Sequence, residues 1–304
     1  MTCLLPGLLT GCETTRHTRY NHYMDVKNYE AAKDFLQEEV GQDPYNPEAH
    51  LQLGLVHLQL GEYKEAQEAF RGSRQTSSEY IDRIGFLLEK YYRMELKAAI
   101  KAMNKDNYEE AVSCLLKAKE LKPGRHEIYP ALGYSYLQLQ KYDEARSGYL
   151  QATALNDRDA ASFHALAELA FRQDDTAGAF EYARLATHID GQLYAAQEIL
   201  AYTGLDQENY ELAEQAFLSI PEERRSVSLV RNYALTLFNK GEFNRALPHL
   251  ESLNKRVENN VQILQTLAMT YYHLNHYTKM VETYEAIRKH NPDSQRPSQE
   301  PDML

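Results

Sequence analysis

The chain has 304 residues, of which 43% are apolar and 25% are charged, so it can bury a hydrophobic core. Its 33 Lys or Arg and 44 Asp or Glu give a net charge of −11, which argues against nucleic acid or an anionic membrane surface as the main partner. The 14 glycines and 10 prolines are few for this length and favour helices over many short strands.

The sequence carries no motif of a catalytic or cofactor-binding site. It has no nucleophile elbow, no zinc-protease motif and no glycine-rich phosphate-binding loop. Its three cysteines, Cys3, Cys12 and Cys114, do not have the spacing of a zinc site or a disulfide framework. We therefore predict a protein that is not an enzyme and that binds no metal, cofactor or small-molecule substrate.

The first twelve residues end in Leu9-Thr10-Gly11-Cys12, which resembles the bacterial lipobox. This resemblance implies that lipid is attached to Cys12 and anchors the chain in a membrane. The segment 1–12 is short for a signal peptide, is interrupted by Pro6 and has no basic residue, so it resembles a truncated leader. Because Glu13 follows the cysteine, the expected location is the outer membrane, facing the periplasm. The alternative is a coincidental apolar segment on a cytoplasmic protein.

A repeated pattern, an aromatic residue three positions before an alanine, organises the rest of the chain. Six clear copies and two degenerate ones are centred on Tyr29, Tyr63, Tyr108, Tyr142, Thr176, Tyr210, Phe243 and Tyr277. Five of the seven gaps between successive positions are 34 residues long. A small residue stands nine positions before most of these sites, and a large apolar residue follows seven positions after most of them.

This period and pattern resemble the tetratricopeptide repeat, a helix–turn–helix unit of 34 residues. The resemblance covers residues 13–292 and implies an all-α, right-handed superhelical solenoid of about eight units. The units are expected to start near residues 13, 47, 92, 126, 160, 194, 227 and 261. Residues 293–304 are predicted to be a disordered tail.

One gap is 45 residues, which is 11 more than the regular period. Eleven residues make nearly three helical turns, so this insertion keeps the apolar face in phase. We predict a lengthened helix at about residues 79–104. It is interpreted either as a spacer that packs on the first two units or as a spine that contacts a partner.

In tetratricopeptide arrays the first helices line a concave groove, and this likeness assigns positions 2, 5, 9 and 12 of each unit to it. Positions 9 and 12 of the last five units are apolar or aromatic in nine of ten cases, which is unexpected for a solvated face. The candidate groove residues are Tyr134, Leu137, His164, Phe171, Tyr202, Leu205, Arg231, Leu235, Phe238, Met269 and Tyr272. Such a groove suits a partner helix or an extended segment. The alternative is that superhelical curvature buries the rings between neighbouring first helices.

These observations predict a scaffold or adaptor for protein–protein interaction, held at a membrane by lipid on Cys12. The family likeness points to the assembly of an envelope complex, such as a pilus, secretion or polysaccharide-export system. The alternative is a soluble cytosolic adaptor without a lipid anchor.

Overall fold

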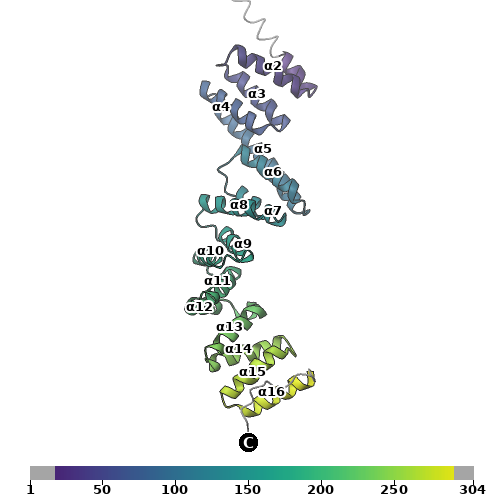
Figure 1. Cartoon of the computed structure of the whole chain (residues 1–304). Helices are drawn as coiled ribbons and strands as arrows, with labels where there is room; N and C mark the ends of the chain where they lie inside the picture. The colour runs from purple at the N-terminus through teal and green to yellow at the C-terminus, as the bar shows by residue number, and fades with distance from the viewer. Residues whose placement is uncertain (1–17, 291–304) are drawn as a thin grey trace, which may run out of the picture. The chain divides into compact units, whose positions relative to one another are not determined.

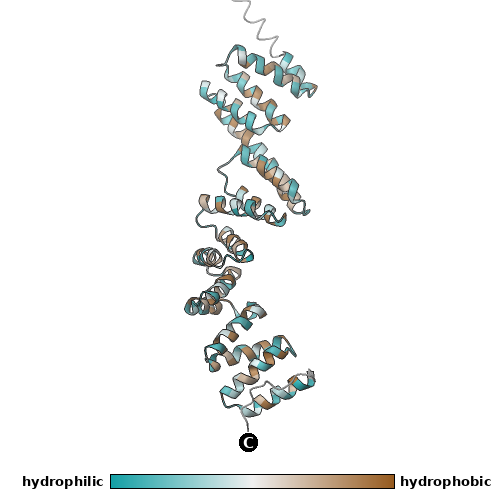
Figure 2. Cartoon of the chain, in the orientation of Figure 1, coloured by the Kyte–Doolittle hydropathy of each residue, from teal (hydrophilic) through white to brown (hydrophobic). Residues whose placement is uncertain are grey.

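The computed structural model describes residues 18–290, which form helices joined by short turns (Figure 1). The lipobox-like segment ending at Cys12 and the predicted tail 293–304 lie outside the described residues. The chain divides into two compact units, residues 1–156 and 157–304. Both apolar and polar residues appear on the described helices, as expected for amphipathic helices that pack on one side (Figure 2).

In the first unit, residues 18–25 are helical and precede seven longer helices. These are α2 (Tyr29–Gln42), α3 (Pro47–Leu60), α4 (Tyr63–Thr76), α5 (Ile81–Met103), α6 (Tyr108–Leu121), α7 (Ile128–Gln138) and α8 (Tyr142–Leu155). Each helix packs on its neighbour in sequence within the pairs α3–α4, α5–α6 and α7–α8.

The second unit contains four further helix pairs. They are α9 (Ala160–Arg172) with α10 (Thr176–Ile189), α11 (Tyr194–Asp206) with α12 (Tyr210–Ser219), α13 (Val227–Asn239) with α14 (Phe243–Arg256), and α15 (Val261–His273) with α16 (Tyr277–His290). A short 3-10 turn, η1 (Glu222–Arg224), joins α12 to α13. The predicted all-α fold of about eight helix–turn–helix units is confirmed, whereas the superhelical course stays a prediction.

Every repeat position is the first residue of a second helix, because the turn before it has one recurring geometry. The residue two positions earlier has a φ between 56° and 77° in all eight turns. The next amide N–H then donates to the carbonyl five residues back, for example from Asn209 to Gly204 at 2.8 Å. This Schellman-type bond ends the first helix and satisfies one of its last carbonyls.

Only Gly61 and Gly241 bring glycine to this left-handed position, where a side chain is disfavoured. The other six turns accept residues such as Lys27 and Gln140 there. In several turns the following Asn or Asp caps the second helix, as Asn28 does by accepting the N–H of Ala31. The cap and the Schellman-type bond together define where each second helix begins.

Small residues line the buried contact between the two helices of a pair. The seven alanines that stand three residues after a repeat position have no exposed surface: Ala32, Ala66, Ala111, Ala145, Ala179, Ala213 and Ala246. On the opposing first helix, a Cβ on Gly204 would lie 3.1 Å from the Cβ of Ala213. In α7 and α8, a Cβ on Gly148 would lie 2.8 Å from the backbone nitrogen of Gly133. Small residues therefore allow the backbones to approach closely.

The sequence predicts a lengthened helix at about 79–104, and the structure has the 23-residue helix α5 at 81–103. Ile84, Leu88 and Tyr91 on its inner side are buried in the same core cluster as residues of α3 and α4. The Gln59 side-chain amide of α3 also donates to the Tyr91 hydroxyl at 2.6 Å. The inner side of α5 therefore packs within the first unit, while Phe86 on its outer side is 70% exposed.

Among residues 18–290, no helix combines the length and the apolar character needed to cross a membrane.

The helix contact in α7 and α8 predicts opposite outcomes for two glycine-to-alanine substitutions. Gly148→Ala is expected to lower the free energy of unfolding by about 1–3 kcal/mol, because its Cβ meets the backbone of α7. Gly85→Ala, at an exposed site of α5 with no atom within 4 Å of the added Cβ, is expected to raise it by about 0.5–1 kcal/mol. Urea denaturation of both variants measures the difference. Equal effects would contradict the close contact.

Candidate partner-binding face

The first helices of the second unit touch one another in succession. Contacts join α9 to α11, α11 to α13 and α13 to α15, so these four helices share one continuous face. The predicted groove residues from His164 to Tyr272 lie on these helices, whereas Tyr134 and Leu137 lie on α7 of the first unit. We call the face formed by α9, α11, α13 and α15 the first-helix face.

The predicted groove residues are neither fully buried nor fully exposed. Tyr134 and Phe171 have 44% and 41% of their surface exposed, and the other nine residues have intermediate exposure. Tyr202, Phe238 and Tyr272 pack against the core of the second unit along one side of the ring. Each ring therefore contributes to packing and still presents apolar surface to solvent.

Aromatic rings adjoin one another along this face. The Phe171 and Tyr202 rings, from α9 and α11, have centroids 6.0 Å apart. Phe238 of α13 contacts Phe243 at 5.4 Å, and Phe243 stacks on His273 with a centroid separation of 4.1 Å and an interplanar angle of 4°.

Sequence reasoning missed Phe243, His273 and Tyr277 as part of this surface. Tyr277 lies 6.4 Å from Tyr272, centroid to centroid. Phe243 and Tyr277 could have been found from the sequence, because each is the repeat aromatic that begins a second helix. Each therefore lies close to position 12, at the end of the preceding first helix. Among residues 18–290 no group of three or more His, Cys, Asp or Glu side chains has the arrangement of a metal site.

Three polar side chains interrupt the apolar surface. Glu198 of α11 accepts a hydrogen bond from the Ser226 hydroxyl. Arg231 of α13 has its Nε atom buried without a hydrogen-bond partner. Burial lowers the pKa of His164, and the nearby Glu168 carboxylate partly opposes that shift. A His with a lowered pKa stays neutral near pH 7, so Arg231 is the main positive group among these three.

Arg231 and Glu198 both lie near the Tyr202 hydroxyl. Burial raises the pKa of Tyr202, with a further contribution from Glu198, whereas Ser226 and Arg231 oppose the shift. The tyrosine therefore stays protonated at neutral pH and can donate a hydrogen bond. This arrangement can hold a polar group of a ligand within an apolar surface.

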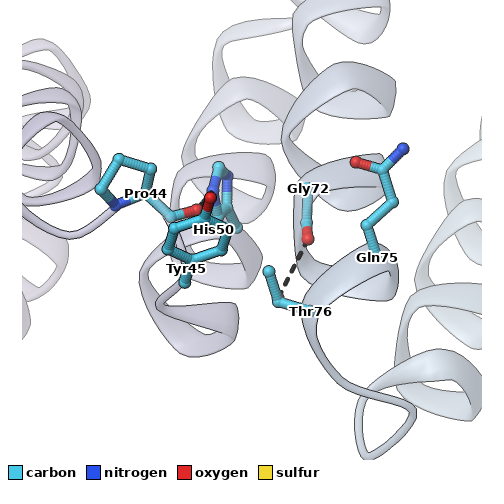
Figure 3. Close-up of a pocket in the computed structure, with 6 residues that line it drawn as sticks. All are labelled: Pro44, Tyr45, His50, Gly72, Gln75 and Thr76. Carbon is cyan, nitrogen blue, oxygen red and sulfur yellow. Dashed lines mark hydrogen bonds between the residues drawn. The ribbon is translucent and has the colours of Figure 1, made fainter.

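A separate cavity of about 550 Å³ lies in the first unit, lined by Pro44, Tyr45, His50, Gly72, Gln75 and Thr76 (Figure 3). His50 donates from Nε2 to the Pro44 carbonyl at 3.0 Å, and Thr76 donates from its hydroxyl to the Gly72 carbonyl at 3.0 Å. His50 Nε2 and the Thr76 hydroxyl thus bond to the local backbone, whereas His50 Nδ1 is buried without a hydrogen-bond partner. None of the predicted site residues lies in this cavity.

Comparison with known proteins identifies the repeat. Sequence profiles described as tetratricopeptide repeat match residues 23–76, 96–125, 131–194 and 264–294, together more than half of the chain. Over 176 residues the chain is 27% identical to the type IV pilus assembly protein PilF of Pseudomonas aeruginosa. That alignment covers 56% of this chain and 64% of PilF, which is less than two thirds of the relative.

Solved structures support the same fold. The structure of P. aeruginosa PilF matches with a TM-score of 0.50 at 17% identity, covering 68% of this chain and 95% of PilF. YrrB, described as a tetratricopeptide protein with an unusual peptide-binding site, matches with a TM-score of 0.52 at 14% identity, covering 59% of this chain and 93% of YrrB. A tetratricopeptide protein from Parabacteroides merdae matches with a TM-score of 0.51 at 18% identity, over 68% of this chain and 81% of that protein.

The helix pairs, the recurring turn and the profile matches agree with one another. This chain belongs to the tetratricopeptide repeat family, a family of protein-interaction scaffolds that are typically not enzymes.

Proposed function

We propose that this protein is an assembly scaffold of a bacterial envelope complex, of the type IV pilus class. In this proposal, lipid on Cys12 tethers it to the outer membrane facing the periplasm, and the first-helix face holds a helix or extended segment of a partner protein. The half-exposed aromatic surface of α9, α11, α13 and α15 is the observation that carries the binding function. Similarity to PilF supports the choice of an envelope complex.

The apolar and polar parts of the face have different roles in this proposal. Rings such as Phe171, Tyr202 and Phe238 provide anchors of the type that dominates interface energies. Arg231 supplies one positive group, which suits a carbonyl or carboxylate of the partner. A partner segment with apolar residues at helical spacing and one acceptor group near Arg231 matches both features.

A buried donor without a partner costs folding free energy, so Arg231 is expected to serve binding at the expense of stability. Arg231→Met, which keeps the apolar stem, is expected to leave the free energy of unfolding unchanged within about 1 kcal/mol or to raise it. The same substitution is expected to weaken partner binding. Arg184→Met, at an exposed site on α10, is the control that should change neither quantity. A loss of stability in Arg231→Met alone would assign this side chain to the fold.

Fractionation of the native bacterium tests the anchor and the binding face together. The unchanged protein is expected in the outer-membrane fraction with its partner, even after a wash at high salt, whereas Cys12→Ala is expected to be released into the soluble fraction by that wash. The double variant Tyr202→Ala with Phe238→Ala is expected to stay in the membrane fraction. Its affinity for the partner is expected to fall by tenfold or more for each 1.4 kcal/mol of interface energy removed.

Glu144→Ala, at an exposed site of α8, serves as the control for partner loss. If the unchanged protein carries no lipid and is found in the cytoplasm, the soluble adaptor is the correct function. If the double alanine variant unfolds, the rings act mainly in packing, and the partner must bind elsewhere.

A further inference from the structure

The outer side of α5 carries a row of basic and apolar side chains. Spaced along this 23-residue helix, the following residues are all exposed: Arg83, Phe86, Lys90, Arg93, Met94, Lys97, Ile100 and Lys101. From Phe86 to Lys101 the row extends about 22 Å at 1.5 Å per residue. The opposite side of the helix is buried in the core of the first unit.

This region has the opposite charge from the chain as a whole. Residues 83–125 contain ten Lys or Arg and six Asp or Glu, a net charge of +4, within a chain whose net charge is −11. Helix α5 alone has five Lys or Arg and three Asp or Glu, a net charge of +2, so an anionic surface that the net charge of the whole chain disfavours can still bind this helix.

The positive charges on α5 are largely unneutralised. Among residues 18–290, Arg83, Lys97 and Lys101 form no ion pair. Arg93 shares the Glu89 carboxylate with Lys122 at 2.5 Å and Arg125 at 2.8 Å, so three cations surround one anion.

The Glu89 site shows how strong this local positive field is. Hydrogen bonds from Lys122 and Arg93 lower the pKa of Glu89 to about 2, and Arg125 adds to the shift. The carboxylate therefore stays ionised at any physiological pH and still leaves the group of charges with a net excess of positive charge.

Three apolar side chains stand among these cations. Phe86 is 70% exposed, Met94 is 50% exposed and Ile100 is 47% exposed. Arg83 and Lys90 lie one helical turn to either side of Phe86, at spacings of three and four residues. Large apolar groups held in water next to unpaired cations indicate a surface that meets an anionic and apolar partner.

We propose that the outer side of α5 docks on an anionic membrane surface. Long Lys and Arg side chains can reach lipid phosphates while Phe86, Met94 and Ile100 enter the region between headgroups. The outer surface of one helix needs no shape-complementary partner for this contact, which favours a lipid surface over an acidic protein segment. The contact deepens the proposed membrane function but does not rest on the lipid at Cys12, to which it would add a second membrane contact.

Vesicle co-sedimentation tests this contact with the full chain carrying Cys12→Ser, so that no lipid can be attached. We expect binding to vesicles made of equal parts phosphatidylcholine and phosphatidylglycerol, loss of binding at high salt, and no binding to phosphatidylcholine alone. Lys97→Glu with Lys101→Glu is expected to reduce partitioning at least tenfold, and Phe86→Ser severalfold.

Arg184→Glu with Lys289→Glu, on α10 and α16, makes the same change in net charge at exposed sites and is expected to leave partitioning unchanged.

If a charge-reversed α5 variant loses its helical circular dichroism, Lys97→Gln with Lys101→Gln replaces it. Absence of vesicle binding, equal binding to neutral vesicles, or equal losses in the α5 and control variants would overturn the proposal. Salt-dependent dimers without vesicle binding would also overturn it and assign the face to a second copy of the chain. Because Cys12 is absent from this test, its failure is separate from failure of the lipid tether.

Discussion

The close contact between the two helices of each repeat is the constraint on which the rest of the structure depends. Seven alanines at one position of the repeat have no exposed surface, and the eighth copy, Met280, is 8% exposed. Gly204 stands opposite Ala213, and an added Cβ at Gly204, or at Gly133 against Tyr149, would meet the neighbouring helix. No single helix pair encloses an apolar core, so these contacts must recur along the chain before stacking can stabilise it.

The same contact determines what the first helices present to solvent. Small residues occupy the side of the first helix that faces the second helix. Positions 9 and 12 therefore face the neighbouring first helices and the solvent. Phe238 and Tyr272 accordingly pack on the core along one side and keep the rest of their surface exposed. The candidate binding surface is thus a consequence of how the repeat packs. Its polar residues, including Arg231, are the part of the surface that the packing does not require.

The period of 34 was enough to predict the fold, since an aromatic three residues before an alanine marks the start of each second helix. The exposure of the rings could not be predicted, because it depends on how closely successive first helices approach. The left-handed turns could not be predicted from the sequence either. Six of the eight have a residue such as Lys27 or Gln140 at the left-handed position, where glycine is the usual signal. The basic side of α5 emerged only when the structure separated its buried residues from its exposed ones.

Close helix approach at the buried alanine stabilises the array. Urea denaturation of Ala213→Leu and Ala195→Leu compares the same substitution at two sites, one against Gly204 and the other exposed on α11. Overpacking predicts a loss of about 1–3 kcal/mol or more for Ala213→Leu, while Ala195→Leu should change stability by less than about 0.5 kcal/mol. Equal free energies of unfolding for the two variants would show that close helix approach at this position does not stabilise the array.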